Sequence, residues 1–225
     1  MESRMRFGSV FFLTVETKFL AFIAFAILFS ALPFCASAQI KSDIQAGFSF
    51  TSQREDYTDS GTDFSNKTYR FGAEIANFNT FQSGFGFFEL LNFQFFRRGT
   101  AKSSLTDDTD YGNDPFFALD FFAGPAFVYS LNRKKSLQVG IGFHWFYQYW
   151  KTDGFTFADT DAGAGVIFNY KYKLSRTISL ILGGCAYFDF YCSKSYIYDN
   201  VSYSIPADDF TRIGIEPHLL LSIDF

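Results

Sequence analysis

Residues 137–149, with the sequence LQVGIGFHWFYQY, decide the fold. Every odd-numbered position from Leu137 to Tyr149 is apolar or aromatic, whereas the even-numbered positions include Gln138, His144 and Gln148. Successive side chains of a β-strand point to opposite faces. This period of two therefore predicts a strand with one apolar face and one mostly polar face.

The same alternation recurs in eight segments after residue 39, separated by polar stretches that contain Gly and Asp. The segments cover residues 40–53, 67–78, 85–98, 115–129, 137–149, 162–174, 177–192 and 213–225. Short turns alternate with longer links, which lie at 54–66, 99–114, 151–161 and 193–210. This asymmetry is typical of transmembrane β-barrels, whose short turns are periplasmic. We therefore predict an all-β fold, an eight-stranded antiparallel transmembrane β-barrel of up-and-down topology with both termini periplasmic.

Glycine indicates which face lines the interior. Ten of the 11 glycines in these segments lie on the polar face, and only Gly184 lies on the apolar face. The interior of an eight-stranded barrel is just wide enough for side chains, so small residues must make room there for larger ones. The polar face is therefore predicted to line the lumen and the apolar face to contact lipid. A soluble β-sandwich or lipocalin, the alternative, would direct its aromatic face inward.

Residues 1–38 are predicted to form a secretory signal peptide, which leaves residues 39–225 as one barrel domain. Three cations precede the apolar stretch 19–32, and Ala36-Ser37-Ala38 forms a small-residue cleavage site. The apolar stretch has 14 residues, whereas a helix needs about 20 to cross a bilayer. A retained helical anchor and lipid attachment at Cys35 are the less favoured alternatives.

Composition excludes several classes of protein. The chain of 225 residues is 22% aromatic and has a formal net charge of -4. The aromatic content excludes a disordered chain, and the acidic balance lacks the basic footprint of a nucleic-acid-binding protein. Cys185 and Cys192 lie seven residues apart, on opposite faces by simple alternation, so we expect neither a disulfide nor a cysteine metal site.

Polar and charged residues on the inward face predict a network inside the lumen. They are Arg70, Glu74, Asn92, Gln94, Asp120, His144, Asn169, Lys171, Tyr187, Asp189, Glu216 and His218. An ion pore needs such groups, but a narrow lumen also needs its charges paired to be stable, and we favour an internal salt-bridge network. Arg70 shares the loop-side half with Asp120, Asp189 and Glu216, one of which is its expected partner.

The last segment carries a family resemblance. Leu219, Leu221 and Ile223 alternate up to the terminal Phe225, and the chain resembles the small OmpA/OmpX-type outer-membrane barrels. The resemblance implies a bacterial outer-membrane location, contact with membrane lipid and lipopolysaccharide, and insertion by the barrel assembly machinery. Cleavage before Gln39 and the aromatic content are similar to barrels of the Bacteroidota. The family includes adhesins, anchors, enzymes and machine subunits, so the fold alone implies no activity.

An enzymatic interpretation depends on His144, His218 and Glu216. Lipid A deacylases, which resemble this chain in size, place a Ser two residues after a His, whereas Phe146 and Leu220 occupy those positions here. Without a matching nucleophile and base, we expect no catalytic residue, no cofactor and no metal site.

The four longer links carry 14 Asp and Glu against four Lys and Arg, which predicts an acidic face outside the membrane. Residues 108–114 partly resemble a calcium loop, but the Gly comes one position early and no Glu follows at the twelfth position, so a solvated acidic face is the simpler interpretation. Candidates for binding lipopolysaccharide phosphates are the loop-side cations Lys67, Arg97, Arg98 and Arg212.

Glu89 stands on the apolar face of segment 85–98. A carboxylate facing lipid is unfavourable, which predicts either a position near the membrane interface or a β-bulge that shifts the register.

These observations favour a non-enzymatic structural or interaction barrel, acting alone or as a small subunit of a larger envelope complex. We expect a protein partner and no nucleic acid. The alternative is a narrow pore or a conduit for small or hydrophobic solutes, and a lipid-modifying enzyme is less favoured.

Overall fold

The computed structural model describes residues 40–59, 61–104, 109–112, 116–152, 155–198, 201–205 and 208–224. The predicted signal peptide and the terminal Phe225 lie outside the described residues. Within this part of the chain, no helix is long and apolar enough to cross a membrane.

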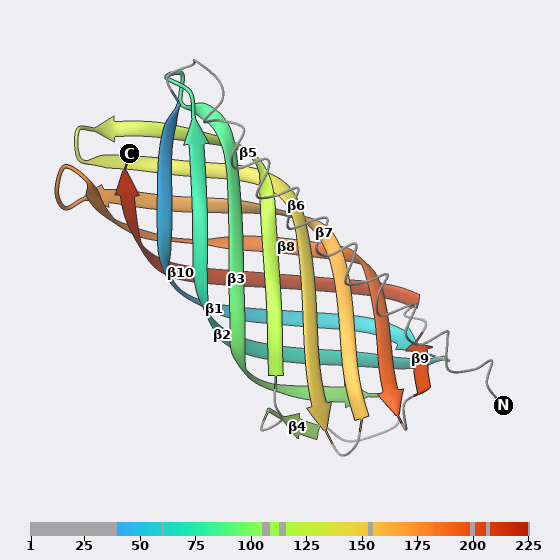
Figure 1. The fold of residues 1–225 in the computed structure, drawn as a ribbon. Coiled ribbons are helices and arrows are strands. Elements are labelled where there is room, and N and C mark those ends of the chain that lie inside the picture. Colours follow the sequence, from blue (N-terminus) through green and yellow to red (C-terminus); the bar gives the residue numbers. More distant parts are fainter. Residues whose placement is uncertain are drawn as a thin grey trace, which may run out of the picture.

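Eight long antiparallel strands form a closed barrel, as predicted (Figure 1). They are β1 (Lys41–Asp59), β2 (Thr62–Thr80), β3 (Phe85–Ser103), β5 (Phe116–Asn132), β6 (Lys135–Thr152), β7 (Phe155–Lys173), β8 (Ile178–Tyr198) and β10 (Asp208–Asp224). Two short strands, β4 (Thr109–Tyr111) and β9 (Val201–Ile205), pair with β3 and β8. Strand β10 pairs with both β8 and β1, which closes the sheet and leaves the long strands without a free edge.

The two ends of the barrel differ. At the turn end lie the start of β1, the finish of β10 and the short turns at residues 81–84, 133–134 and 174–177. At the opposite end, here called the loop end, the predicted long links are mostly strand. Strands β1 and β2 stay in register from Lys41 opposite Thr80 to Asp59 opposite Thr62. The prediction of a loop at 54–66 was therefore wrong. The backbone hydrogen bonds between β1 and β2 extend beyond the membrane, where the strands need no apolar face.

The outward and inward faces follow the predicted alternation. Ile141 points outward and is 61% exposed, whereas Gln138 on the same strand points inward and is 1% exposed. On β1 the outward apolar residues end at Phe50, and residues 51–59 continue past them. A barrel strand needs only about 9–11 residues to cross a bilayer, so the loop end projects beyond the membrane.

Inward glycines make room for large side chains, as expected. A Cβ atom at Gly140 would lie 2.6 Å from the ring of Phe88, and one at Gly214 would lie 2.2 Å from the ring of Tyr187. Phe88 belongs to an apolar cluster with Phe78, Phe122 and Ile167 that fills part of the lumen towards the turn end. The rings of Phe88 and Phe122 meet edge to face with centroids 4.9 Å apart.

A β-bulge in β3 changes the direction of one predicted lipopolysaccharide contact. Phe71 pairs with Phe96, but the next residue, Gly72, pairs with Gln94, so that Phe95 and Phe96 both face outward. Beyond this bulge the alternation is inverted, and Arg97 is buried inside the lumen. Its predicted position on the outer surface was wrong.

Glu89 lies outside the region that the bulge affects. It pairs with Asn77 on β2 and stays on the outward face, four residues after β3 begins at the turn end. The bulge therefore does not remove Glu89 from the outer wall. Its place near the strand end agrees with the interface alternative.

A second bulge, in β8, has a similar effect. Ala162 pairs with Tyr191 and Gly163 with Asp189, which leaves Phe190 and Tyr191 both outward. Cys192 therefore lies opposite the inward residue Asp161, on the same side of the sheet as Cys185. The prediction that the two cysteines face opposite sides was wrong, although both are free thiols, as expected.

Candidate functional site

His144 and two carboxylates occupy the centre of the lumen. Its Nδ1 lies 2.6 Å from Asp189 Oδ1, and its Nε2 contacts Asp120 Oδ1. The imidazole also stacks on the ring of Tyr187 with centroids 4.0 Å apart. Because both ring nitrogens face carboxylate oxygens, this geometry fits the doubly protonated imidazolium.

Two arginines flank Phe146 on the loop side of this centre. The guanidinium of Arg212 lies 4.0 Å from the ring centroid and that of Arg70 lies 4.3 Å from it, both at cation–π distance. Arg212 Nη1 also lies 2.6 Å from Asp161 Oδ2, and its Nε donates to Asp189 Oδ2 at 2.9 Å. Arg212, Asp161 and Asp189 are fully buried, so the cations and carboxylates form a layer across the barrel.

Gln94 links this layer to the middle of the lumen. Arg70 Nη1 donates to Gln94 Oε1 at 3.1 Å, and Gln94 Nε2 donates to Thr51 Oγ1 at 3.0 Å. The same Nε2 lies 3.4 Å from both Asp120 Oδ2 and Glu216 Oε2. Asp120 and Glu216, two of the three acids expected as partners of Arg70, therefore lie next to the Gln94 amide that Arg70 binds.

A second polar group lies nearer the turn end. Asp43 Oδ2 accepts from Lys171 Nζ and from Gln138 Nε2, each at 2.6 Å. His218 Nε2 lies 2.7 Å from Asn169 Oδ1, and its Nδ1 lies 2.9 Å from Glu74 Oε1. The polar contacts therefore continue along the lumen towards the turn end.

All 12 residues predicted to line the lumen are buried there, which confirms the assignment of the inner face. Two further groups were misplaced. Arg212 is not a surface cation, because it points inward on β10. Three of the predicted acidic loop residues, Glu55, Asp159 and Asp161, also point into the barrel and are buried. Lys194, turned inward by the β8 bulge, contacts Glu55 and lies 3.7 Å from the Tyr57 ring centroid.

Part of the predicted acidic face cannot be placed. Asp107, Asp108, Asp114, Asp153 and Asp199 lie outside the described residues, and the calcium-like stretch 108–114 is described only at residues 109–112. Among the residues that are described, no group of three His, Cys, Asp or Glu side chains has the geometry to hold a metal ion.

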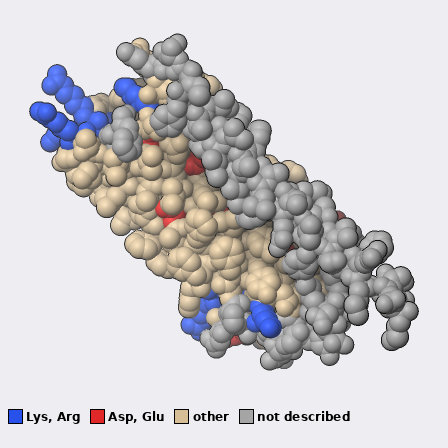
Figure 2. All heavy atoms as spheres, in the orientation of Figure 1, with Lys and Arg blue, Asp and Glu red and all other residues tan. Residues whose placement is uncertain are grey.

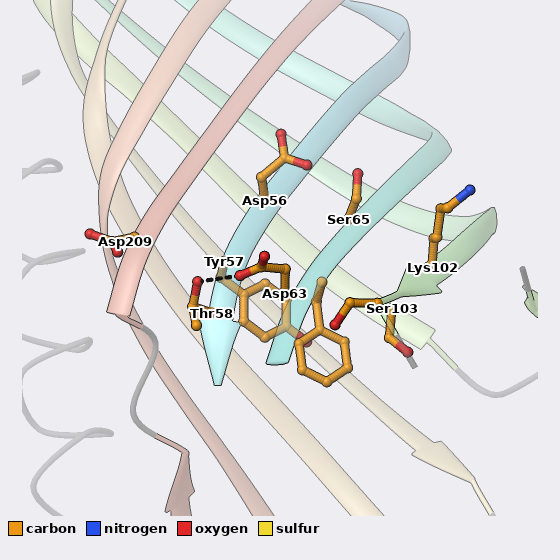
Figure 3. Close-up of a pocket in the computed structure, with 10 residues that line it drawn as sticks. Asp56, Tyr57, Thr58, Asp63, Ser65, Lys102, Ser103 and Asp209 are labelled. Atoms are coloured by element: carbon orange, nitrogen blue, oxygen red, sulfur yellow. Dashed lines mark hydrogen bonds between the residues drawn. The ribbon is translucent and has the colours of Figure 1, made fainter. Parts of the chain in front are cut away.

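A pocket of about 320 Å³ opens at the loop end, where the β1–β2 hairpin meets β3 and the start of β10 (Figure 3). The rings of Tyr57 and Phe64 stack there with centroids 5.0 Å apart, and Thr58 Oγ1 donates to Asp63 Oδ1 at 2.9 Å. Asp209 lines the pocket with a left-handed backbone, φ 50°, which Asp tolerates better than most residues. Aromatic, hydroxyl and carboxylate groups therefore surround an open cavity outside the membrane.

Asp56, on the pocket rim beyond the apolar band, is held in its charged form. Partial burial raises the pKa of its carboxyl, but hydrogen bonds from Arg54 and Ser65 outweigh burial, and the pKa lies below its ordinary value. Arg54 Nε donates to Asp56 at 2.8 Å.

No protein-family model and no curated protein sequence matches the chain. Solved structures do. Outer membrane protein OprG from Pseudomonas aeruginosa is 9% identical, with a TM-score of 0.57 over 82% of this chain and 95% of that chain. A major outer membrane protein from Thermus thermophilus is 14% identical, with a TM-score of 0.49 over 80% of this chain and 99% of that one. Neisserial surface protein A is 11% identical, with a TM-score of 0.46 over 82% and 97%.

The first of these similarities, together with the closed sheet and its apolar outer wall, decides the fold. The chain is a small eight-stranded outer-membrane β-barrel. The barrel therefore lies in the outer membrane, in contact with membrane lipid, and the resemblance to OmpA/OmpX-type barrels is confirmed at the level of the fold. An identity of 9% to OprG carries no information about activity.

Sequence reasoning missed several residues of the barrel interior. Phe146 and Arg212 occupy even-numbered positions of β6 and β10, the same parity as His144 and Glu216, so alternation alone would have found them. Lys194 and Arg97 carried no such signal, because their direction depends on the two bulges.

Proposed function

We propose that the protein is a closed, non-enzymatic barrel that acts as a structural or interaction protein through its loop end. The layer of Arg70, Phe146, Arg212, Asp189 and His144 across the lumen carries this proposal. These side chains are nearly or fully buried and bind one another, as expected of a packed interior rather than a water-filled channel. His144 takes part in these contacts and His218 binds Asn169 and Glu74, which favours a structural role over catalysis for both histidines.

The loop end offers the surface for a partner. Strands that continue past the apolar band hold the pocket of Tyr57, Phe64 and Asp63 away from the bilayer on paired hairpins rather than on free loops. A rigid, preorganised surface loses less entropy on binding than a flexible loop does. We propose that this end faces the cell exterior and the turn end faces the periplasm, in keeping with barrels whose short turns are periplasmic.

Lipopolysaccharide contact is proposed for two of the four cations considered. Lys67 and Arg98 point outward and are exposed just beyond the apolar residues of β2 and β3. Tyr69, also outward, pairs with Arg98 and lies two residues from Lys67. Cations at this height suit lipid phosphates, with an aromatic side chain between them at the interface.

Conductance across a planar bilayer tests the closed lumen. We expect folded, heat-modifiable protein to produce no current above background, because the buried side chains of Arg70, Phe146 and Arg212 pack against one another across the lumen. Reproducible steps that disappear on heat denaturation would contradict the proposal and support the pore alternative.

Co-purification tests the interaction role. Tagged protein extracted from native outer membranes in mild detergent should retain a stoichiometric partner. Replacing Asp63 and Asp209 in the pocket with Asn should weaken that association while leaving the folded form intact on a gel. A change in the mass of lipid A that depends on His144 would instead indicate an enzyme and overturn the proposal.

A further inference from the structure

Two turns at the turn end carry a concentrated positive charge. Arg133, Lys134 and Lys135 lie at the β5–β6 turn, and Lys173 and Arg176 at the β7–β8 turn, and all five are exposed. The sequence contains no Asp or Glu from residue 121 to 152 or from 162 to 188. The third short turn, residues 81–84, has the uncharged sequence Phe-Gln-Ser-Gly. Lys41, at the start of β1, is also exposed at the turn end, but the five cations of the two turns concentrate the charge on one side of it.

The two charged turns form one surface. Strands β6 and β7 are neighbours, with Lys135 opposite Tyr172, and the backbone N–H of Lys173 donates to the carbonyl oxygen of Lys134 at 2.8 Å. In Figure 2 blue atoms gather at the barrel end where Figure 1 shows these two turns. Five cations from adjacent turns can therefore act on one anionic surface. The five residues are called the basic turn cluster below.

Exposed apolar side chains lie directly beside the basic turn cluster. Leu131 is 47% exposed and lies two residues before Arg133, and Leu174 is 57% exposed and follows Lys173. Tyr129 and Tyr172 are outward and exposed on the same two hairpins. Aromatic and apolar residues next to cations are characteristic of the boundary between acyl chains and headgroups. The cluster therefore lies at headgroup height rather than free in solution.

We propose that the basic turn cluster binds the headgroups of anionic phospholipids in the leaflet at the turn end. Lys and Arg beside a membrane attract anionic lipids, and their N–H groups donate to phosphate oxygens. The flanking leucines favour lipid over a hydrated anionic polymer such as cell wall, because such a polymer would leave them in water. This binding anchors one side of the turn end at the membrane surface. It is separate from the partner surface at the loop end.

Native mass spectrometry of the purified barrel tests the proposal. In detergent with equal amounts of phosphatidylglycerol and phosphatidylcholine, the wild-type protein should retain phosphatidylglycerol preferentially. The variant R133Q/K134Q/K135Q/K173Q/R176Q should lose this preference by tenfold or more. The variant R133K/R176K keeps all five charges and should retain it. Heat modifiability on a gel verifies that each variant is folded.

Three results would overturn the proposal. The first is an unchanged preference for phosphatidylglycerol in the fivefold Gln variant. The second is loss of bound lipid on addition of millimolar inorganic phosphate, which would indicate a site for a free anion. The third is an absent lipid preference together with cosedimentation with isolated cell wall that requires the same five cations, which would indicate a polymer ligand.

Discussion

The two faces of each strand differ in what their side chains need from their surroundings. Outward residues such as Ile141 and Leu221 contact lipid, and another apolar residue of similar size would satisfy the same environment. Inward residues such as Gln138 and Arg212 bind particular atoms on other strands. The outer face therefore locates the barrel in the membrane, whereas the inner face specifies which strands pair and in what register.

The largest effect is expected from breaking the layer around Phe146. Arg212→Met would leave the buried carboxylate of Asp161 without its cation and that of Asp189 with only His144, and breaking a buried pair in this way costs about 3–5 kcal/mol. Urea unfolding in lipid vesicles measures the loss. Arg98→Met removes an exposed cation and should change the free energy of unfolding by no more than about 0.5 kcal/mol. A similar loss of unfolding free energy in both variants would mean that the contacts of the inner face do not stabilise the barrel more than an exposed cation does.

Placing a charge on the lipid-facing side should have the next largest effect. Ile141→Arg is expected to lower the free energy of unfolding by about 2–4 kcal/mol near the bilayer midplane. Ser52→Arg, on the outward face just beyond the apolar residues of β1, should cost only about 0–1 kcal/mol. If the two substitutions had the same effect in the same vesicles, the apolar band would be misplaced.

Substitution of the inward amide Gln138 should destabilise the barrel more than its polar character suggests. Alternation alone predicts that changes at Gln138 are mild, but its side chain donates to Asp43 and accepts from Gln45 at 2.9 Å. Gln138→Leu would leave buried polar atoms unpaired and should cost about 1–3 kcal/mol in the same unfolding measurement. The outward neighbour Val139→Leu should be close to neutral. A neutral Gln138→Leu variant would show that the network near the turn end does not contribute to stability.

The smallest effect is expected at Glu89. This carboxylate lies on the outer wall but near the end of β3, where acidic residues cost little compared with cations at the midplane. Glu89→Gln should change the free energy of unfolding by less than about 1 kcal/mol. A stabilisation well above that value would place Glu89 deep in the bilayer and would contradict the interface position.

Alternation predicted the eight strands and the inner face because each side chain in the membrane has only two possible environments, lipid outside the barrel and the lumen inside it. It could not predict the bulges. Phe95-Phe96 and Phe190-Tyr191 are aromatic pairs at bulges, but Phe87-Phe88 and Phe121-Phe122 are similar pairs without one. Both members of such a pair suit either lipid or a packed interior, so composition does not reveal the change in register. The directions of Arg97 and Lys194 follow from these bulges.

The loop-end pocket and the strand extensions were missed for a different reason. Residues 54–66 are polar on both faces because the hairpin projects into water, and polarity of this kind is also typical of loops. The pairing of Asp59 with Thr62 distinguishes a projecting hairpin from a loop, and this pairing is visible only in the structure. The stacking of Tyr57 on Phe64 follows from that pairing.

The two cysteines after the predicted signal peptide provide the most direct test of a packed lumen. Both point inward, but Cys185 belongs to the apolar cluster, whereas Cys192 lies nearer the loop end and is partly exposed. In a Cys35→Ser background, a charged methanethiosulfonate reagent added to the folded barrel should leave Cys185 unmodified until urea unfolds the protein, and should modify Cys192 earlier. Rapid modification of Cys185 in the folded barrel would show that water crosses the lumen and would contradict the account.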